Sequence, residues 1–256
     1  MSVVQLRYAL DRVAFARSVG MEPDKWQARL LRSDAERVII NASRQAGKSA
    51  VSAIIALHKA LYQPGSLSLC LAPSLRQSQE LFAKIIVYYR DLGRPVPAES
   101  EQRLGLELEN RSRIHCLPGS EKSVRGFTAD LLILDEAARI DDALYHSVRP
   151  MLAVSEGSLM MLSTPYGRRG VFYDVWSKGG EHWERYKIPV TDVPRISQRF
   201  IEEERHALPA RIFQQEYRCS FEQADGAFFR AEDVERLLVK PGNKYKAIDF
   251  GGGLVV

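Results

Sequence analysis

Cysteine is scarce in this 256-residue chain, and its three cysteines stand far apart. Cys70, Cys116 and Cys219 form no CxxC pair and have no histidine nearby at metal-ligand spacing. Their isolation argues against both a structural zinc site and a disulfide framework. We therefore expect them to be reduced, partly buried thiols.

The chain also lacks a long uncharged apolar run. Arg7, Asp11, Arg12 and Arg17 interrupt the apolar pattern of the first twenty residues, which excludes a membrane span or a secretory signal peptide there. Neither charge sign is in large excess, since 36 basic and 32 acidic residues leave a net charge of +4. Any nucleic-acid contact must then come from a local basic patch. These absences predict a soluble intracellular protein.

What the sequence does contain is an alternation of helical and strand patterns. Apolar residues at helical spacing predict helices at 4–16, 24–32, 49–62, 74–92 and 142–152. Short apolar runs predict strands at 37–42, 67–72, 131–135 and 159–163, with a hairpin at 104–108 and 114–117. The alternation predicts an α/β fold with a mainly parallel sheet flanked by helices.

The pattern loosens after Thr164. It predicts helices at 171–176, 197–206 and 210–217 and a strand at 183–190. We interpret roughly the last quarter as a small helical appendage. The predicted division is a core at 1–195 and a lid or linker subdomain at 196–256.

A phosphate-binding loop is predicted at residues 42–49, ASRQAGKS, which lie between a strand and a helix. Gly47 would let backbone amides face the phosphates, Lys48 would reach the β and γ oxygens, and the Ser49 hydroxyl would ligate Mg²⁺. A GKS triplet also occurs at ordinary helix starts. The flanking strand and helix favour the P-loop of an ATPase.

This loop departs from the GxxxxGK[ST] pattern at its first position, where Ala42 replaces glycine. We expect the backbone to follow a slightly different path there. Arg44 within the loop is also unusual. It either adds a cation near the γ-phosphate or is a solvated arginine, and the sequence favours neither.

Two acids end the apolar run LLILDE at 131–136. At the tip of a parallel strand, Asp135 would hold the magnesium shell and Glu136 would polarise a water for attack on the γ-phosphate. Two carboxylates at a strand end can also be a solvated turn. With a P-loop upstream in the right order, the catalytic interpretation is favoured, and it indicates hydrolysis rather than transfer to an acceptor.

Three further positions are candidates. Arg139 follows the acidic strand and could act as an arginine finger for a neighbouring subunit or be a surface residue. Ser163 and Thr164 end the next strand and could sense the γ-phosphate or be ordinary strand-end hydroxyls. Rivals of Arg139 for the finger are Arg125, Arg149, Arg168 and Arg169.

Trp26 and Gln27 lie near the N-terminus. The Gln27 amide could pair with the adenine edge, because it carries both a donor and an acceptor. We expect Trp26 to pack in the core instead.

With these motifs in this order, the chain resembles the ATPase domain of a large terminase subunit, the DNA-packaging motor of tailed bacteriophages. The resemblance rests on Trp26–Gln27, the P-loop that contains Arg44 and lacks the first glycine, LLILDE, and LSTP at 162–165. It extends to about Tyr217. It implies a P-loop fold of the ASCE or RecA-like kind.

The resemblance also implies roles for individual residues. Gln27 would contact adenine, and the phosphates would be cradled by Arg44, Gln45, Ala46, Gly47, Lys48 and Ser49. Lys48, Glu136 and Arg139 would be catalytic, with Ser49 and Asp135 at Mg²⁺. Ser163 and Thr164 would couple loss of the γ-phosphate to movement.

The implied partners are double-stranded DNA, a portal protein and a small terminase subunit, in the host cytoplasm and transiently on the procapsid. The chain would work in a homo-oligomeric ring, expected to be a pentamer, and could be monomeric as an isolated domain. No membrane association is expected.

Large terminases also carry a nuclease domain. The segment YKAIDFG at 245–251 resembles a first nuclease strand that ends in Asp249, but no partner acids follow. We therefore expect a truncated chain without nuclease activity. Alternatives to the packaging motor are a helicase-like translocase, for which the chain is short, and an ATP-dependent switch or clamp, which would not need Glu136.

Overall fold

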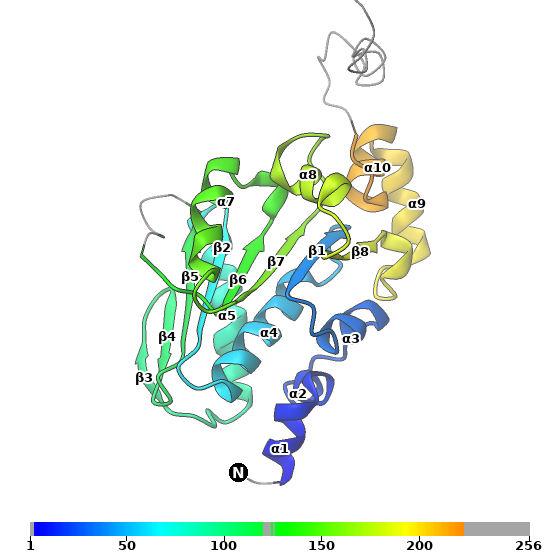
Figure 1. Cartoon of the computed structure of the whole chain (residues 1–256). Helices are drawn as coiled ribbons and strands as arrows, with labels where there is room; N and C mark the ends of the chain where they lie inside the picture. The colour runs from blue at the N-terminus through cyan, green and yellow to red at the C-terminus, as the bar shows by residue number, and fades with distance from the viewer. Residues whose placement is uncertain (1–2, 120–123, 125, 223–256) are drawn as a thin grey trace, which may run out of the picture. The chain divides into compact units, whose positions relative to one another are not determined.

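The computed structural model describes residues 3–119, 124 and 126–222, within a compact unit of Met1–Glu222. Its centre is a sheet of eight strands in the order β3-β4-β5-β2-β6-β7-β1-β8 (Figure 1). The strands are β1 (Arg37–Ala42), β2 (Leu67–Ala72), β3 (Ala98–Glu101), β4 (Gly105–Leu108), β5 (Arg113–Pro118), β6 (Leu131–Asp135), β7 (Ser158–Ser163) and β8 (Glu184–Ile188). Six neighbouring strands of the sheet, β5, β2, β6, β7, β1 and β8, pair in parallel. The remaining strands β3 and β4 pair antiparallel, so the prediction of a mainly parallel sheet is confirmed.

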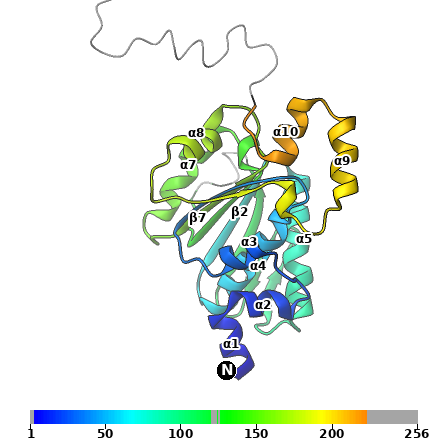
Figure 2. The ribbon, with the colours of Figure 1, turned by 90° about the vertical axis from the view of Figure 1, so that its right-hand side faces the viewer.

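Helices cover both faces of this sheet. One face packs against α2 (Arg12–Ser18), α3 (Lys25–Leu31), α4 (Lys48–Tyr62) and α5 (Leu75–Asp91). The other face packs against α7 (Asp142–Val148), α8 (Gly170–Lys178) and a 3₁₀ turn (Arg149–Leu152). Figure 2 shows α7 and α8 on the side of the sheet opposite α5.

The continuous apolar runs of the strands follow from this double coverage. In β6, Leu131 and Ile133 join the first core, whereas Leu132 and Leu134 join the second. Successive side chains of a strand point to opposite faces, so a strand covered on both faces needs apolar residues at every position.

The N-terminal segment corrects the prediction of one helix at 4–16. Two helices, α1 (Val3–Leu10) and α2, meet at Asp11. The Asp11 carboxylate accepts hydrogen bonds from the backbone amides of Val13 (2.9 Å) and Ala14 (3.1 Å) and so caps the second helix. Strand β3 was not predicted, because its sequence AESE lacks an apolar pattern.

Two helices follow the sheet, α9 (Gln198–Ala207) and α10 (Ala210–Arg218). They share a small core of Val190, Ile201, Phe213 and Tyr217. The backbone at the end of α10 bonds to the end of β1, because Asn41 Nδ2 donates to the Cys219 carbonyl oxygen at 3.0 Å. The predicted boundary at 195/196 stays a prediction, and the segment 245–251 with Asp249 lies outside the described residues.

All three cysteines are unpaired and buried. Burial raises the pKa of the Cys219 thiol to about 12 and also raises that of Cys116, which lies beside Cys70 on the neighbouring strand. Over the part of the chain that is described, no helix has the length and apolarity to cross a membrane.

Candidate nucleotide-binding site

The loop between β1 and α4 has the backbone that a phosphate cradle requires. Positive φ angles fall at Gln45 (58°) and Gly47 (89°), directly before α4 begins at Lys48. A Cβ atom at Gly47 would lie 2.6 Å from the side-chain nitrogen of Gln27. Glycine is required here both for its φ and for this close approach.

The structure explains why Ala42 can replace the first glycine of the motif. Ala42 is the last residue of β1, is completely buried and pairs with Ile188 of β8. Its extended backbone needs no glycine, because the left-handed conformations occur later, at Gln45 and Gly47.

Lys48 lies at the centre of the site. Its ammonium donates to Thr164 Oγ1 at 3.0 Å and to the Ser43 carbonyl oxygen at 3.3 Å. It also lies 3.6 Å from Glu136 Oε1, and only 8% of the side chain is exposed. One cation therefore joins the P-loop to the acid that follows β6 and to the hydroxyl that follows β7.

Asp135 and Glu136 have different environments although they are adjacent. Asp135 is buried, accepts a hydrogen bond from the Ser49 hydroxyl at 3.4 Å and has its pKa raised to about 6 by burial and by the Glu136 charge. Glu136 lines the cavity and has a left-handed backbone (φ 51°, ψ 44°). A non-glycine residue in this region is strained, and such strain is found at functional sites.

The strand order brings these groups together. β7 lies between β1 and β6, so Ser163 and Thr164 lie between the P-loop and the two acids. The Ser163 hydroxyl is 3.2 Å from Glu136 Oε2 and 2.8 Å from the Thr164 carbonyl oxygen.

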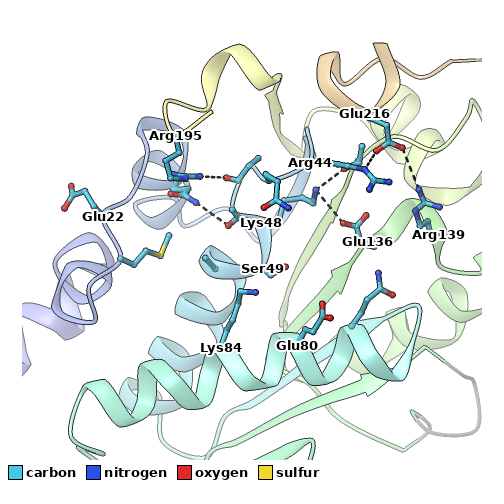
Figure 3. A pocket seen from close by; sticks show the side chains of 18 residues that line it. Glu22, Arg44, Lys48, Ser49, Glu80, Lys84, Glu136, Arg139, Arg195 and Glu216 are labelled. Atoms are coloured by element: carbon cyan, nitrogen blue, oxygen red, sulfur yellow. Dashed lines mark hydrogen bonds and ion pairs between the residues drawn. The ribbon is translucent and has the colours of Figure 1, made fainter. Parts of the chain in front are cut away.

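Two arginines of the site meet one glutamate of α10 (Figure 3). Arg44 Nε is hydrogen-bonded to the Glu216 carboxylate, and Arg139 Nη2 is 4.0 Å from its other oxygen. The Arg139 guanidinium also lies over the Tyr166 ring, 4.3 Å from its centroid. The Glu216 hydrogen bond raises the pKa of Arg44 above its ordinary value.

The rivals of Arg139 have contacts of their own, and one of them, Arg169, shares the Tyr166 ring with Arg139. Arg149 stacks on Tyr145, Arg168 donates to the Phe221 carbonyl oxygen, and Arg169 stacks on Tyr166. None of these three lines the cavity beside the P-loop, and Arg125 lies outside the described residues.

Gln27 and Arg195 form the wall beside the P-loop. The Gln27 side chain accepts from the Asp24 amide at 2.9 Å, which closes a capping box on α3, and donates to the Gly47 carbonyl oxygen at 3.3 Å. Arg195 donates to the Ala46 carbonyl oxygen at 3.1 Å and pairs with Asp24 at 2.6 Å. Trp26 packs in the core, as predicted.

These groups surround an open cavity of about 920 Å³. The P-loop forms its floor, and α5 faces the P-loop across the cavity with Gln77, Glu80 and Lys84 (Figure 3). Arg44, Lys48, Arg139 and Arg195 make the P-loop side rich in cations. A polyanionic ligand such as a nucleotide phosphate fits this chemistry.

Mg²⁺ also fits the residues present. No group of three or more His, Cys, Asp or Glu side chains occurs within the described ranges, so an all-protein metal cage is absent there. Mg²⁺ usually takes one or two protein oxygens and completes its shell with phosphates and waters. Ser49 and the buried Asp135 offer such a pair, and a cation would relieve the cost of burying the carboxylate.

Glu216, Arg195 and the α5 residues were not predicted from the sequence. Glu216 lies 172 positions from Arg44, in a helix whose pattern indicates only an amphipathic surface. Arg195 lies in a loop without a motif. No local signal could have assigned them to this cavity.

Residues 39–236 match the family described as terminase large subunit, T4likevirus-type, N-terminal. The chain belongs to this family. It is 26% identical over 261 residues to the terminase large subunits of Thermus virus P23-45 and Thermus phage G20c. These alignments cover 88% of the chain and 54% of each relative, so the chain spans about half the length of these terminases.

Solved terminase structures resemble the fold. The ATPase domain of the Thermus phage P74-26 large terminase superposes with a TM-score of 0.72 at 25% identity, over 81% of this chain and 97% of that one. The large terminase of another thermophilic bacteriophage, in complex with ADP, gives a TM-score of 0.62 at 13% identity, over 86% of this chain and 54% of that one. The second likeness concerns the fold alone.

Proposed function

We propose that this chain is the ATP-hydrolysing motor domain of a large terminase, which drives double-stranded DNA into a procapsid. The observation that carries the proposal is the cluster in which Lys48 contacts both Glu136 and Thr164 beside a cation-rich cavity. Family membership supports the packaging role. The complexes of the thermophilic bacteriophage large terminase with ADP and with ATP-γ-S support the choice of nucleotide.

The proposed reaction begins with an exchange of partners at Lys48. Phosphate oxygens would replace Glu136 and Thr164 around the ammonium, while the amides of the P-loop bind the phosphates. Glu136 would then be free to accept a proton from the attacking water. Ser49 and Asp135 would hold Mg²⁺, which neutralises phosphate charge when bound.

Ser163 and Thr164 are proposed to report the state of the nucleotide. Thr164 contacts the ammonium that would bind the phosphates, and Ser163 contacts the proposed base. Loss of the γ-phosphate would restore the contact between Thr164 and Lys48 and shift the loop after β7. Gln27 lies against Gly47, which supports its place near the nucleotide, and its contact with adenine stays a prediction.

We propose Arg139 as the finger that acts on a neighbouring subunit. Its side chain is 36% exposed, so a second copy of the chain can reach it. This role requires the homo-oligomeric ring, for which a pentamer remains the prediction. DNA, portal protein and small terminase subunit are its proposed partners. The core at 1–195 would carry the chemistry, and 196–256 would lead toward a further domain.

The test is steady-state ATP hydrolysis against protein concentration for the parent, Glu136→Gln and Arg139→Ala. Removal of the base should lower turnover about 100-fold or more while ATPγS still binds. In the parent, turnover per molecule should rise with protein concentration. In Arg139→Ala, turnover per molecule should not depend on concentration.

Near-parental turnover of Glu136→Gln would contradict the hydrolytic mechanism. A parent that binds ATPγS without hydrolysing ATP, at any concentration, would support the switch instead. If the rise with concentration persists in Arg139→Ala, the finger is another residue.

A further inference from the structure

A second cavity, of about 170 Å³, opens at the amino ends of the strands. Its lining comes from β1, β6, β7, the start of α2, the last turn of α4 and the loop that follows α3. Lys59 of this cavity and Lys48 of the nucleotide site both lie on α4, about 16 Å apart along the helix axis. The proposed reaction uses none of the residues that line the second cavity.

The inner part of the second cavity is apolar. Its apolar side chains belong to the core between α4 and the sheet, and they are Leu30, Val38, Ile55, Leu131 and Met160. Ile55 is only half-buried, although its neighbours Ile54 and Ala56 are completely buried. An alkyl group bound here would remove the remaining surface of Ile55 from water.

Two cations lie at the edge of the second cavity. The Arg12 guanidinium donates to the Ser33 carbonyl oxygen at 2.9 Å and lies 3.5 Å from the Asp34 carboxylate. Lys59 is half-buried, and none of the residues that the structure describes forms a hydrogen bond or an ion pair with its ammonium. Lys59 is therefore a cation that is available to a ligand.

The carboxylates near Lys59 are engaged elsewhere. Asp130 accepts a hydrogen bond from the Leu67 amide at 2.7 Å. Asp34, the one acid among the described residues that line the second cavity, is 93% exposed. Burial lowers the pKa of the Lys59 ammonium, the Asp130 charge opposes this shift, and the Arg12 charge adds to it. A partly buried ammonium without a bonded counter-ion favours an anionic ligand.

We propose that the second cavity binds a short aliphatic carboxylate, whose carboxyl group meets Lys59 and Arg12 and whose alkyl group covers Ile55. The volume limits the ligand to about six non-hydrogen atoms, because a water molecule, with one such atom, occupies about 30 Å³. Isobutyrate has this size. The same chemistry occurs in a free acid and at the carboxyl end of a peptide that ends in valine. The proposal does not rest on the proposed function.

The test is a titration with isobutyrate at constant ionic strength, followed by NMR through the amide resonances of Val38, Ile55 and Met160. These resonances should shift saturably, with a Kd of about 1–10 mM for so small a ligand. Isobutyramide has the same shape without the charge and should bind at least about fivefold more weakly. Acetate lacks the apolar carbons and should bind at least about threefold more weakly.

Variants separate the charge of the site from its shape. Lys59→Met keeps the unbranched side chain, removes the charge and should weaken isobutyrate binding at least about fivefold. The matched control is Lys178→Met on α8, where Lys178 pairs with Asp174, and its Kd should stay within about twofold of the parent. Ala35→Leu fills the second cavity, keeps both cations and should abolish the saturable shifts, so it decides if Lys59→Met does not fold.

The absence of saturable shifts up to about 50 mM isobutyrate would overturn the proposal. So would equal binding of isobutyramide, or unchanged binding by a folded Lys59→Met variant. Acetyl-glycyl-valine distinguishes the two sources, because tighter binding than isobutyrate supports a chain end and weaker binding supports a free acid. A parent that binds isobutyrate but not ATPγS would refute the proposed function and leave this site in place.

Discussion

The two ends of the central sheet use charged residues in opposite ways. At the amino ends of the strands, Arg37 donates to the Gly157 carbonyl oxygen at 2.8 Å and Asp130 accepts from the Leu67 amide at 2.7 Å. At the carboxyl ends, Lys48 and Glu216 are partnered largely by other side chains that a ligand could replace. Charges bonded to backbone stabilise the fold, whereas charges held by exchangeable side chains are available for binding and chemistry.

Two lysines of the same helix test this contrast with the largest expected effect. Lys48→Ala, at the carboxyl end of the sheet, should weaken ATPγS binding about 100-fold, because a charge-assisted contact with the phosphates is lost. Lys59→Ala, at the other end of α4, should change the Kd by less than about twofold. Titration calorimetry measures both, and similar losses in the two variants would remove the distinction between the ends.

At the amino ends of the strands, a titrating side chain should instead change the free energy of unfolding with pH. His58 contacts the Tyr8 carbonyl oxygen and the rings of Phe15 and Tyr62, and burial lowers its pKa from 6.5 to about 4. The folded protein therefore resists protonation that the unfolded chain accepts. The contribution of His58 to the free energy of unfolding is fully present above pH 6.5 and is lost as the pH falls toward 4.

Urea unfolding at pH 7.5 and pH 5.0 measures this loss. The parent should lose about 2 kcal/mol more than His58→Gln between these two values, because carboxylate contributions are common to both proteins. ATPγS binding at pH 7.5 should be alike in the two proteins. Equal pH dependence would show that His58 is protonated without cost in the fold.

Backbone strain at the carboxyl end gives the smallest predicted effect. Glu136→Asn and Glu136→Gln both remove the proposed base, but asparagine tolerates the left-handed backbone better. The asparagine variant should be about 0.5 kcal/mol more stable in urea unfolding. Both variants should turn over ATP at least about 100-fold more slowly than the parent. A more stable glutamine variant would show that the conformation of Glu136 carries no such strain.

The sequence predicted the parts of the site that follow from strand ends. β1, β2 and β6 have the predicted bounds because each is a short run of mostly apolar residues. Parallel strands then bring Lys48, Asp135 and Ser163 to one edge of the sheet. Contacts made by α10 were not predictable. They depend on how a surface helix docks after folding, and neither Glu216 nor its spacing carries a motif.

The break at Asp11 shows a different limit. Helical spacing continues across this residue, so the apolar pattern favoured one helix. The short aspartate side chain instead bonds the amides of the next turn and starts a new helix. Local hydrogen bonding thus overrode periodicity at one position.

The buried thiols have a practical consequence for the study of movement in this domain. Cys70, Cys116 and Cys219 are all shielded from solvent, and burial keeps Cys116 and Cys219 protonated near neutral pH. A cysteine introduced at an exposed position, such as Val154 with 85% of its surface accessible, would be the thiol that a maleimide dye reaches first in the folded protein. Single-site fluorescent labelling should therefore be feasible without replacing the native cysteines.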